Sequence, residues 1–328
     1  MKSYTVEPRF YTACLRCIRP QVMSREPVIR GASALELIDW AEQEFARAGI
    51  LCAQGTASDR DEAAAIVYHV LRLDHNDPLA LATHADPQAE GVCRDLVRRR
   101  IAERIPSAYL LGEAWFAGLP FTVDQRVLLP RSPFAELVLE RFEPWFSAGN
   151  VSRILEIGTG SGCIAVALAL AFPGAELIAT DISADALDVA RMNAARHGVL
   201  DRITLHRGDL YEGIDGRFDL IVSNPPYVPE GDLVGMPREF AWEPRLALVA
   251  GADGLDFVRQ IVLGARPRLA QGGWLAIEVG GGARALEAAF PGVPFLWPEL
   301  ADGADGIALV AVDDLPRHNA PAGRPESG

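Results

Sequence analysis

The tetrapeptide Asn-Pro-Pro-Tyr at residues 224–227 limits how the middle of this chain can fold, because it directly follows an apolar run at residues 218–223. Such a run predicts a buried strand, and proline cannot continue the hydrogen-bond ladder of a sheet, so the strand should end at Asn224. Two consecutive prolines then fix two φ angles and leave carbonyl groups without N–H donors. We therefore expect a rigid corner, rich in hydrogen-bond acceptors, at the end of a buried strand.

The groups at this corner suit a planar amino group. The side-chain oxygen of Asn224 and the carbonyl of Pro225 can accept both N–H bonds of an NH2 group, and Tyr227 offers a ring for stacking. The plainer alternative is a strand-end turn that uses proline for its shape alone. We take Asn224, Pro225, Pro226 and Tyr227 as the candidate catalytic residues.

A glycine-rich loop lies upstream, between an apolar strand expected at residues 153–157 and a helix-like run at residues 164–170. This order of strand, loop and helix opens a nucleotide-binding α/β unit, although glycines also serve tight turns for steric reasons alone. The dinucleotide fingerprint would place its third glycine at position 163, but this chain has Cys163 there and Gly162 before it. The spacing therefore counts against NAD or FAD. The candidate cofactor-binding residues of this loop are Glu156, Gly158, Thr159, Gly160, Ser161 and Gly162.

Two acidic residues at later strand ends extend the candidate cofactor site. Asp181 ends the next expected strand, where a carboxylate can accept both hydroxyls of a ribose. The alternative for this position is helix capping, by Asp181 or by Ser183. Asp209 follows the strand after that and can accept an adenine amino group, while Leu210 packs on the ring. A simple turn would explain Asp209 equally well.

Taken together, these motifs resemble those of the protein N5-glutamine methyltransferases, which use S-adenosylmethionine. A further stretch narrows the resemblance, because the release-factor branch of that family usually reads Pro-Arg-Pro-Glu-Thr-Glu where this chain reads Pro-Arg-Ser-Pro at residues 130–133. The Arg-Ser-Pro form resembles the branch that methylates large-subunit ribosomal protein L3. The resemblance spans residues 34–312, with Phe134 and Ala135 replacing the Ile-Gly usual in this branch.

The resemblance implies a fold, a cofactor and a substrate. The fold would be a seven-stranded, Rossmann-like α/β methyltransferase domain behind a small N-terminal helical domain. The cofactor would be S-adenosylmethionine, approached closely by the glycine loop and bound also by Asp181, Asp209, Leu210 and Asn224. The partner would be ribosomal protein L3, methylated on a glutamine amide nitrogen (N5) held by Asn224 and the Pro225 carbonyl.

Two other classes of function share parts of this pattern. Nucleic-acid amino-methyltransferases use a similar Pro-Pro-aromatic corner, but a net charge of −13 disfavours broad binding to nucleic acid. A non-catalytic nucleotide-binding module would have no need of the corner beside the glycine loop. Five arginines crowd one expected helix, and we interpret them as a solvated face: Arg94, Arg98, Arg99, Arg100 and Arg104.

Cysteine usage and hydropathy bear on the compartment. Five cysteines without framework spacing indicate a reducing environment, and Cys14 and Cys17 form a lone pair with too few partners for a metal site. We expect no bound metal. No apolar run reaches the length of a membrane span, and no secretory signal is evident. We therefore expect a cytoplasmic protein.

The domain organisation follows from helical periodicity, a hairpin-like stretch and the strand–helix alternation. A capping box at Ser33 and Glu36 predicts the first helix, and others are expected near residues 60–73 and 89–103. The hairpin should bend at Gly118 and Pro120. The expected units are an unassigned extension at 1–30, a helical substrate-docking domain at 31–112, a β-hairpin linker at 113–130, a catalytic domain at 131–315 and a disordered tail at 316–328.

Overall fold

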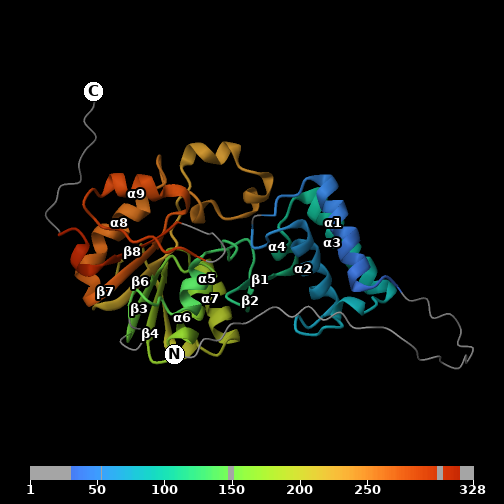
Figure 1. The fold of residues 1–328 in the computed structure, drawn as a ribbon, viewed down its shortest axis with the longest axis horizontal. Helices are drawn as coiled ribbons and strands as arrows, with labels where there is room; N and C mark the ends of the chain where they lie inside the picture. The colour runs from blue at the N-terminus through green and yellow to red at the C-terminus, as the bar shows by residue number, and fades with distance from the viewer. Residues whose placement is uncertain (1–30, 53, 147–150, 301–305, 318–328) are drawn as a thin grey trace, which may run out of the picture.

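The computed structural model describes residues 31–52, 54–146, 151–300 and 306–317. The predictions for residues 1–30, including the Cys14–Cys17 pair, and for almost all of the tail lie outside these residues. Figure 1 shows an all-helical part beside a larger α/β part, with a short hairpin between them.

The helical part contains four α-helices within its described residues: α1 (Ala34–Ala48), α2 (Asp59–Leu71), α3 (Pro87–Glu103) and α4 (Ser107–Leu111). The three long helices confirm the sequence prediction. The capping box at the start of α1 is present, with Ser33 and Glu36 each bonding the other's backbone N–H, and Gly49 ends the helix in a left-handed conformation. Phe45, Ile66 and Val97 lie in the shared core of α1, α2 and α3.

The hairpin consists of β1 (Glu113–Phe116) and β2 (Leu119–Thr122), paired antiparallel. Its bend lies at Ala117 and Gly118, both of which have positive φ. Pro120 was expected in the bend but lies within β2 opposite Trp115. A two-residue turn suffices here, and an edge strand tolerates a residue that lacks an N–H.

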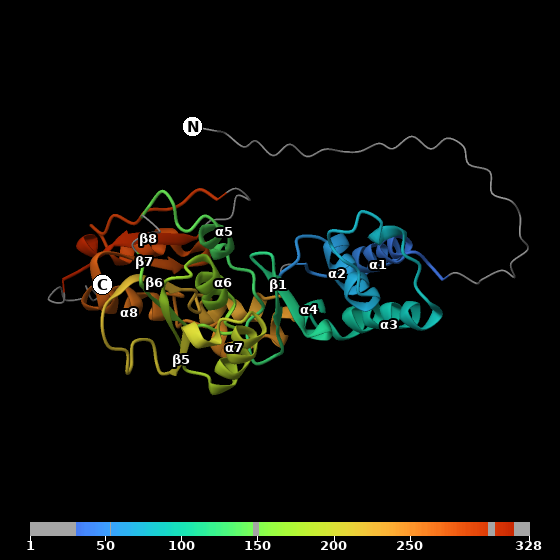
Figure 2. The same cartoon turned by 90° about the horizontal axis from the view of Figure 1, so that it is seen from below.

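The α/β part is a six-stranded sheet in the order β5-β4-β3-β6-β7-β8, parallel except for β8. Adjacent residues of β3 enter opposite core clusters, Ile154 with α5, α6 and α7 and Leu155 with α8, so helices cover both faces. Figure 2 shows the same layers from below. The strands are β3 (Arg153–Ile157), β4 (Glu176–Asp181), β5 (Ile203–Arg207), β6 (Phe218–Ser223), β7 (Leu269–Glu278) and β8 (Ile307–Ala311). The helices are α5 (Phe134–Leu139), α6 (Cys163–Ala171), α7 (Ala184–Arg196), α8 (Asp256–Ala265) and α9 (Ala283–Ala289).

The seventh position of the expected sheet is reduced to a single bridge in the described residues. Leu296 pairs with Leu309 of β8 through two backbone hydrogen bonds of 2.8 Å each. Pro294 and Pro298 flank this bridge and cannot donate to a ladder, which explains why pairing does not extend. The predicted Rossmann-like α/β class is confirmed, with six strands among the described residues where seven were expected.

A closed loop at residues 228–250, called here the 228–250 loop, joins the two parts of the molecule. Val228 pairs with Val249 at its base, and the loop carries the 3-10 helices η4 (Glu230–Gly235), η5 (Arg238–Trp242) and η6 (Arg245–Ala247). Glu239 accepts hydrogen bonds from Leu51 N at 3.4 Å and from Arg104 at 3.3 Å. Figure 1 shows this loop, in orange, reaching the helical part.

The prediction that the arginines at residues 94–104 form a solvated face is wrong for Arg100, and also for Arg104, which is 22% exposed and donates to the carbonyls of Ala48 and Gly49. Arg100 departs from it most. Its side chain is 1% exposed and forms an ion pair with Glu62, which is 3% exposed. One of its terminal nitrogens also lies 3.5 Å from Glu239 of the 228–250 loop. Arg98 and Arg99 remain more than half exposed and pair within their own helix, as expected.

Candidate active site

The glycine loop turns sharply between β3 and α6. Gly158, Gly160 and Gly162 all have positive φ, and a Cβ on Gly162 would lie 3.0 Å from the Cα of Ala190 in α7. Glycine at 162 therefore allows the loop to pack against α7. The carbonyl of Thr180 accepts the N–H groups of Gly158 and Thr159, at 2.8 and 2.9 Å, and ties the loop to the end of β4.

Glu156 is buried beneath this loop. Its carboxyl accepts a hydrogen bond of 2.6 Å from the hydroxyl of Thr159. Burial raises the pKa of Glu156 to about 8, against the lowering effect of the Thr159 hydrogen bond. A cation bound in the adjoining cavity would favour the charged form of this carboxyl.

Asp181 ends β4 beside the loop, and both of its carboxylate oxygens are bonded. Oδ2 accepts from Gly160 N and Oδ1 from Ser183 N, each at 2.9 Å. The cap of α7 is Ser183, whose hydroxyl accepts from Ala186 N, so the alternative role of Asp181 as that cap does not apply. Burial raises the pKa of Asp181. Each oxygen keeps a further lone pair for a hydroxyl donor.

Asp209 and Leu210 lie beside the glycine loop and line the same cavity. Leu210 has a φ of 49°, and its carbonyl accepts a hydrogen bond of 3.4 Å from the hydroxyl of Thr180 at the end of β4. Asp209 is exposed. Nine of the ten residues predicted to bind the cofactor line this cavity, and the exception is Gly162, which packs against α7.

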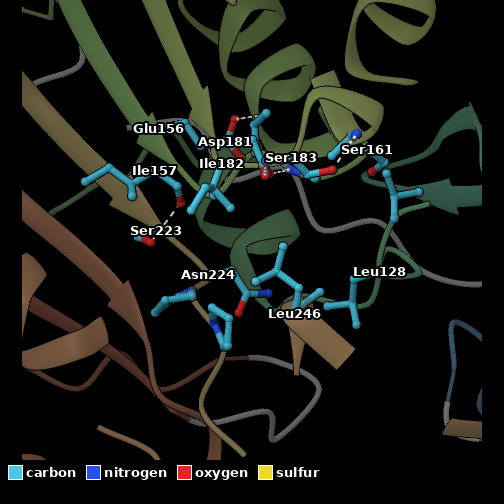
Figure 3. Close-up of a pocket in the computed structure, with 18 of the residues that line it drawn as sticks. Leu128, Glu156, Ile157, Ser161, Asp181, Ile182, Ser183, Ser223, Asn224 and Leu246 are labelled. Atoms are coloured by element: carbon cyan, nitrogen blue, oxygen red, sulfur yellow. Dashed lines mark hydrogen bonds between the residues drawn. The ribbon is translucent and has the colours of Figure 1, made fainter. Parts of the chain in front are cut away.

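The strand β6 ends at Ser223, as the two prolines require. The Ser223 hydroxyl donates to the carbonyl of Ile157 at 2.8 Å and joins the ends of β6 and β3. Asn224, Pro225 and Pro226 follow and line the cavity. Figure 3 shows the Asn224 side chain pointing into this space near Leu246 and Leu128. Within the described residues its side chain makes no hydrogen bond, so its amide remains available to a ligand.

Tyr227 lies behind the corner and is not among the residues that line the cavity. Its hydroxyl donates to Glu278 at 3.1 Å, and its ring packs so closely on Gly280 that a Cβ there would lie 2.8 Å from it. The predicted contribution of Tyr227 to catalysis stays a prediction.

Several residues of the site were not assigned from the sequence. Ser132 lines the cavity and donates to Glu278, the last residue of β7. Arg131 forms two hydrogen bonds with the buried Glu243. The sequence signal that could have identified Glu278 is its place as an acid at the end of a strand, which it shares with Asp181. The apolar part of the cavity comes from Leu128, Leu129, Pro244, Leu246, Ala247 and Phe257.

The chemistry of this cavity fits S-adenosylmethionine. Glu156, Asp181 and Asp209 offer acceptors for hydroxyl and amino groups and negative charge for a cation. The N-terminus of α6 lies next to the glycine loop at one end of the cavity, and the positive end of the helix dipole favours a carboxylate there. Apolar side chains cover the remainder, as a ring system requires.

The comparison with known proteins agrees with this fit. Residues 135–239 match the model of the methyltransferase small domain family. Fold and site together define an S-adenosylmethionine-dependent methyltransferase. The ribosomal protein uL3 glutamine methyltransferase of Bordetella pertussis is 42% identical over 284 residues, which cover 85% of this chain and 95% of the relative. The chain belongs to the ribosomal protein uL3 glutamine methyltransferase family, and this confirms the resemblance seen in the motifs.

Two further relatives with the same name show similar agreement. The one from Francisella tularensis is 39% identical over 286 residues and covers 86% of this chain and 91% of the relative. The one from Xanthomonas campestris is 42% identical over 289 residues, which cover 87% of this chain and 93% of the relative.

Among the described residues, none of the helices is long and apolar enough to cross a membrane.

Proposed function

We propose that this chain methylates the side-chain amide nitrogen (N5) of a glutamine in ribosomal protein uL3, with S-adenosylmethionine as methyl donor. The observation that carries the proposal is the side chain of Asn224, which points into the cavity of the glycine loop that Pro225 also lines. The names of the relatives support uL3 as the substrate. An alternative within the same chemistry is a release-factor glutamine.

The residues around the glycine loop would bind the cofactor. The backbone of residues 158–162 would approach it closely, and Asp181 would accept the ribose hydroxyls. Asp209 would accept the adenine amino group, and Leu210 would pack on the ring. The negative charge of Glu156 would be favoured by the positive charge of the cofactor.

The corner would hold the acceptor amide. The cofactor supplies a methyl group on a positively charged sulfur. A glutamine amide nitrogen is a weak nucleophile, because its lone pair is delocalised into the carbonyl. Asn224 and the Pro225 carbonyl would accept both N–H bonds, orient the nitrogen and raise its electron density. Positioning of this kind supplies up to about 7–11 kcal/mol.

Pro226 and Tyr227 would act on the shape of the corner. Pro226 fixes its own φ, so the chain leaves β6 in one direction. The ring of Tyr227 lies behind the corner and not in the cavity. We therefore assign Tyr227 the role of fixing the position of the corner, and not that of stacking on the amide.

The helical unit at residues 31–112 and the hairpin would dock the protein substrate. A cavity that accommodates one glutamine side chain reads the amide and little else, so discrimination between proteins must come from remote contacts. The site of action would be the cytoplasm. The free thiols of Cys52, Cys93 and Cys163 are consistent with a reducing compartment.

A competition assay tests the proposal. Purified uL3, a release factor and DNA are offered together with cofactor carrying a radiolabelled methyl group, and mass spectrometry locates the label. We expect a labelled glutamine in uL3. Preferential labelling of the release factor would overturn the substrate but not the glutamine chemistry, and labelling of DNA alone would overturn both.

A further inference from the structure

Glu278 connects two segments that line the active site. It is the last residue of β7, and its side chain is buried. Its Oε1 accepts a hydrogen bond of 3.1 Å from the hydroxyl of Tyr227, and its Oε2 accepts one from the hydroxyl of Ser132. Tyr227 belongs to the Asn-Pro-Pro-Tyr corner and Ser132 to the Pro-Arg-Ser-Pro segment, so one carboxyl group holds both.

Both hydroxyl donors are fixed by their surroundings. The Ser132 oxygen also accepts a hydrogen bond of 3.1 Å from Phe134 N, at the start of α5. The ring of Tyr227 lies against Gly280. The backbone carbonyl of Tyr227 lies against Gly254, where an added Cβ would be only 2.4 Å from the carbonyl oxygen. Movement of the Ser132 oxygen would break its bond to Phe134 N, and movement of the Tyr227 ring is limited by its packing on Gly280.

Glu278 can affect the cavity only through the residues to which it is hydrogen-bonded. Ser132, Asn224, Pro225 and Pro226 line the cavity, whereas Glu278 does not. The nearest charged groups that act on it and on Tyr227 are the Arg131 guanidinium and Glu243, which bind each other. Arg131 is therefore already paired and does not neutralise Glu278 through a hydrogen bond.

The protonation state of Glu278 decides how many of these hydrogen bonds exist. A carboxylate accepts hydrogen bonds from both hydroxyls at once. A protonated carboxyl instead donates its own proton to one of the two hydroxyl oxygens and accepts from the other hydroxyl only. One of the two hydroxyl protons then loses its acceptor. We infer that Glu278 is a positioning residue for the methyl transfer proposed above, on which this inference rests. In its charged form it holds the corner and the Pro-Arg-Ser-Pro segment at the separation that the reaction needs.

The titration of this group falls in an accessible range. Burial raises the pKa of Glu278 to about 7, while the hydrogen bonds from Ser132 and Tyr227 and the charge of Arg131 lower it. The wild-type protein should therefore lose activity on acidification through about pH 7.

The first experiment measures kcat and KM for the ribosomal protein from about pH 5.5 to about pH 9. We expect an acidic limb near pH 7 in the wild type. Glu278→Gln should lower kcat about tenfold, abolish the limb and leave KM and cofactor affinity nearly unchanged. Ser132→Ala and Tyr227→Phe each remove a hydrogen bond that favours the carboxylate, so both should move the limb to higher pH.

The matched control is Glu140→Gln, the same change at an exposed carboxylate after α5. It should reproduce the wild-type profile. A Glu278→Gln variant with wild-type kcat and an unchanged limb would overturn the inference.

A second measurement, the pH dependence of stability, does not depend on turnover. It therefore separates this inference from the proposed function. The proposed function itself fails if the wild type methylates no glutamine. Because the folded pKa of Glu278 lies above its ordinary value of 4.5, its contribution to stability is full below about pH 4.5 and is lost as the pH rises through about 7. Glu278→Gln should remove this loss and be no less stable than the wild type at about pH 8. A purely structural role predicts a less stable variant with the pH dependence retained, and that result would overturn the inference.

Discussion

Arg100 of α3 and Glu62 of α2 form an ion pair in which both side chains are buried. Arg100 also donates to the carbonyl of Leu51 at 3.0 Å, and Glu62 accepts from Ser107 N at 3.3 Å, so the pair joins four segments of the helical unit. Through Glu239, the same arginine contacts the 228–250 loop that covers part of the cavity. This pair therefore connects the proposed docking unit to the loop that covers part of the site.

Replacing Arg100 should destabilise the protein strongly. Arg100→Ala leaves the carboxylate of Glu62 buried without its charged partner and leaves Glu239 with Arg104 alone, and breaking a buried pair in this way costs about 3–5 kcal/mol. Urea unfolding of the whole chain measures the change. Arg98→Ala is the control, because Arg98 and Asp95 are about two-thirds exposed and such pairs contribute at most about 1 kcal/mol. Equal, small effects of both substitutions would contradict the buried pairing.

The burial of Arg100 could not be predicted from sequence for a physical reason. Its partners Glu62 and Glu239 lie far along the chain, and the local pattern of five arginines on one helix is typical of a solvated face. The partners of Glu278, which lie 146 and 51 residues away, could not be predicted either, although its place at the end of a strand was itself a local signal. Contacts of this kind depend on how the elements pack and leave no local signal.

The cofactor site could be predicted because its signals are local. The carboxyl ends of parallel strands meet at one edge of a sheet, so the glycines after β3, the acids at the ends of β4 and β5, and Asn224 after β6 had to gather there. The end of β6 was fixed by Pro225 and Pro226. Tyr227 shares that local signal, but the direction of its ring depends on Gly280 and Glu278, which no motif indicated.

Asp181→Ala should weaken S-adenosylmethionine binding by about 1–3 kcal/mol, the range for loss of a hydrogen-bond partner in a buried polar site. The variant loses the proposed acceptor of the ribose hydroxyls and also the bond that orders Gly160. Calorimetry on the purified protein measures the affinity. Ser183→Ala is the control, since it removes the cap of α7 but no proposed cofactor contact, and should lower stability with little change in affinity. Equal losses of affinity would assign the effect of Asp181 to loop structure.

Asn224→Ala should lower kcat by about 100-fold or more and leave cofactor affinity nearly intact. Its side chain is proposed to hold an N–H of the acceptor amide as the new bond forms, and loss of one such preorganised partner lowers kcat by about 10²–10³. Methyl transfer to uL3 and calorimetry with the cofactor are measured on the same preparation. Near-normal turnover would leave the Asn-Pro-Pro-Tyr corner as a turn with no part in the chemistry.

The stability of the cofactor-free protein should depend on the ionisation of Glu156. Its folded pKa, about 8, lies above its ordinary value of 4.5, so its contribution is full below about pH 4.5 and is lost as the pH rises through about 8. Unfolding free energies at about pH 6 and about pH 9 should therefore differ more for the wild type than for Glu156→Gln. Glu176→Gln, at an exposed carboxylate, should behave as the wild type does. Parallel behaviour of the wild type and Glu156→Gln would contradict the assignment.

Trp115 offers a test of substrate docking that leaves the chemistry untouched. It lies on the hairpin with 47% of its surface exposed, and its ring contacts His75, which stacks on Tyr68 of α2. These three rings line a groove between the helical unit and the hairpin. An exposed tryptophan in such a groove is the kind of side chain that dominates binding at protein interfaces.

We therefore expect Trp115→Ala to raise KM for uL3 about tenfold, which corresponds to about 1.4 kcal/mol, with little change in kcat. Cofactor affinity should not change, because Trp115 is not among the residues that line the cofactor cavity. A short glutamine peptide, which cannot reach the groove, should be a poor substrate for the wild type and for Trp115→Ala alike. Leu139→Ala, at a more exposed apolar side chain on α5, should leave KM as in the wild type. An unchanged KM for Trp115→Ala would place substrate docking elsewhere on the molecule, whereas an equal loss with the short peptide would show that the substitution disturbs the cavity itself.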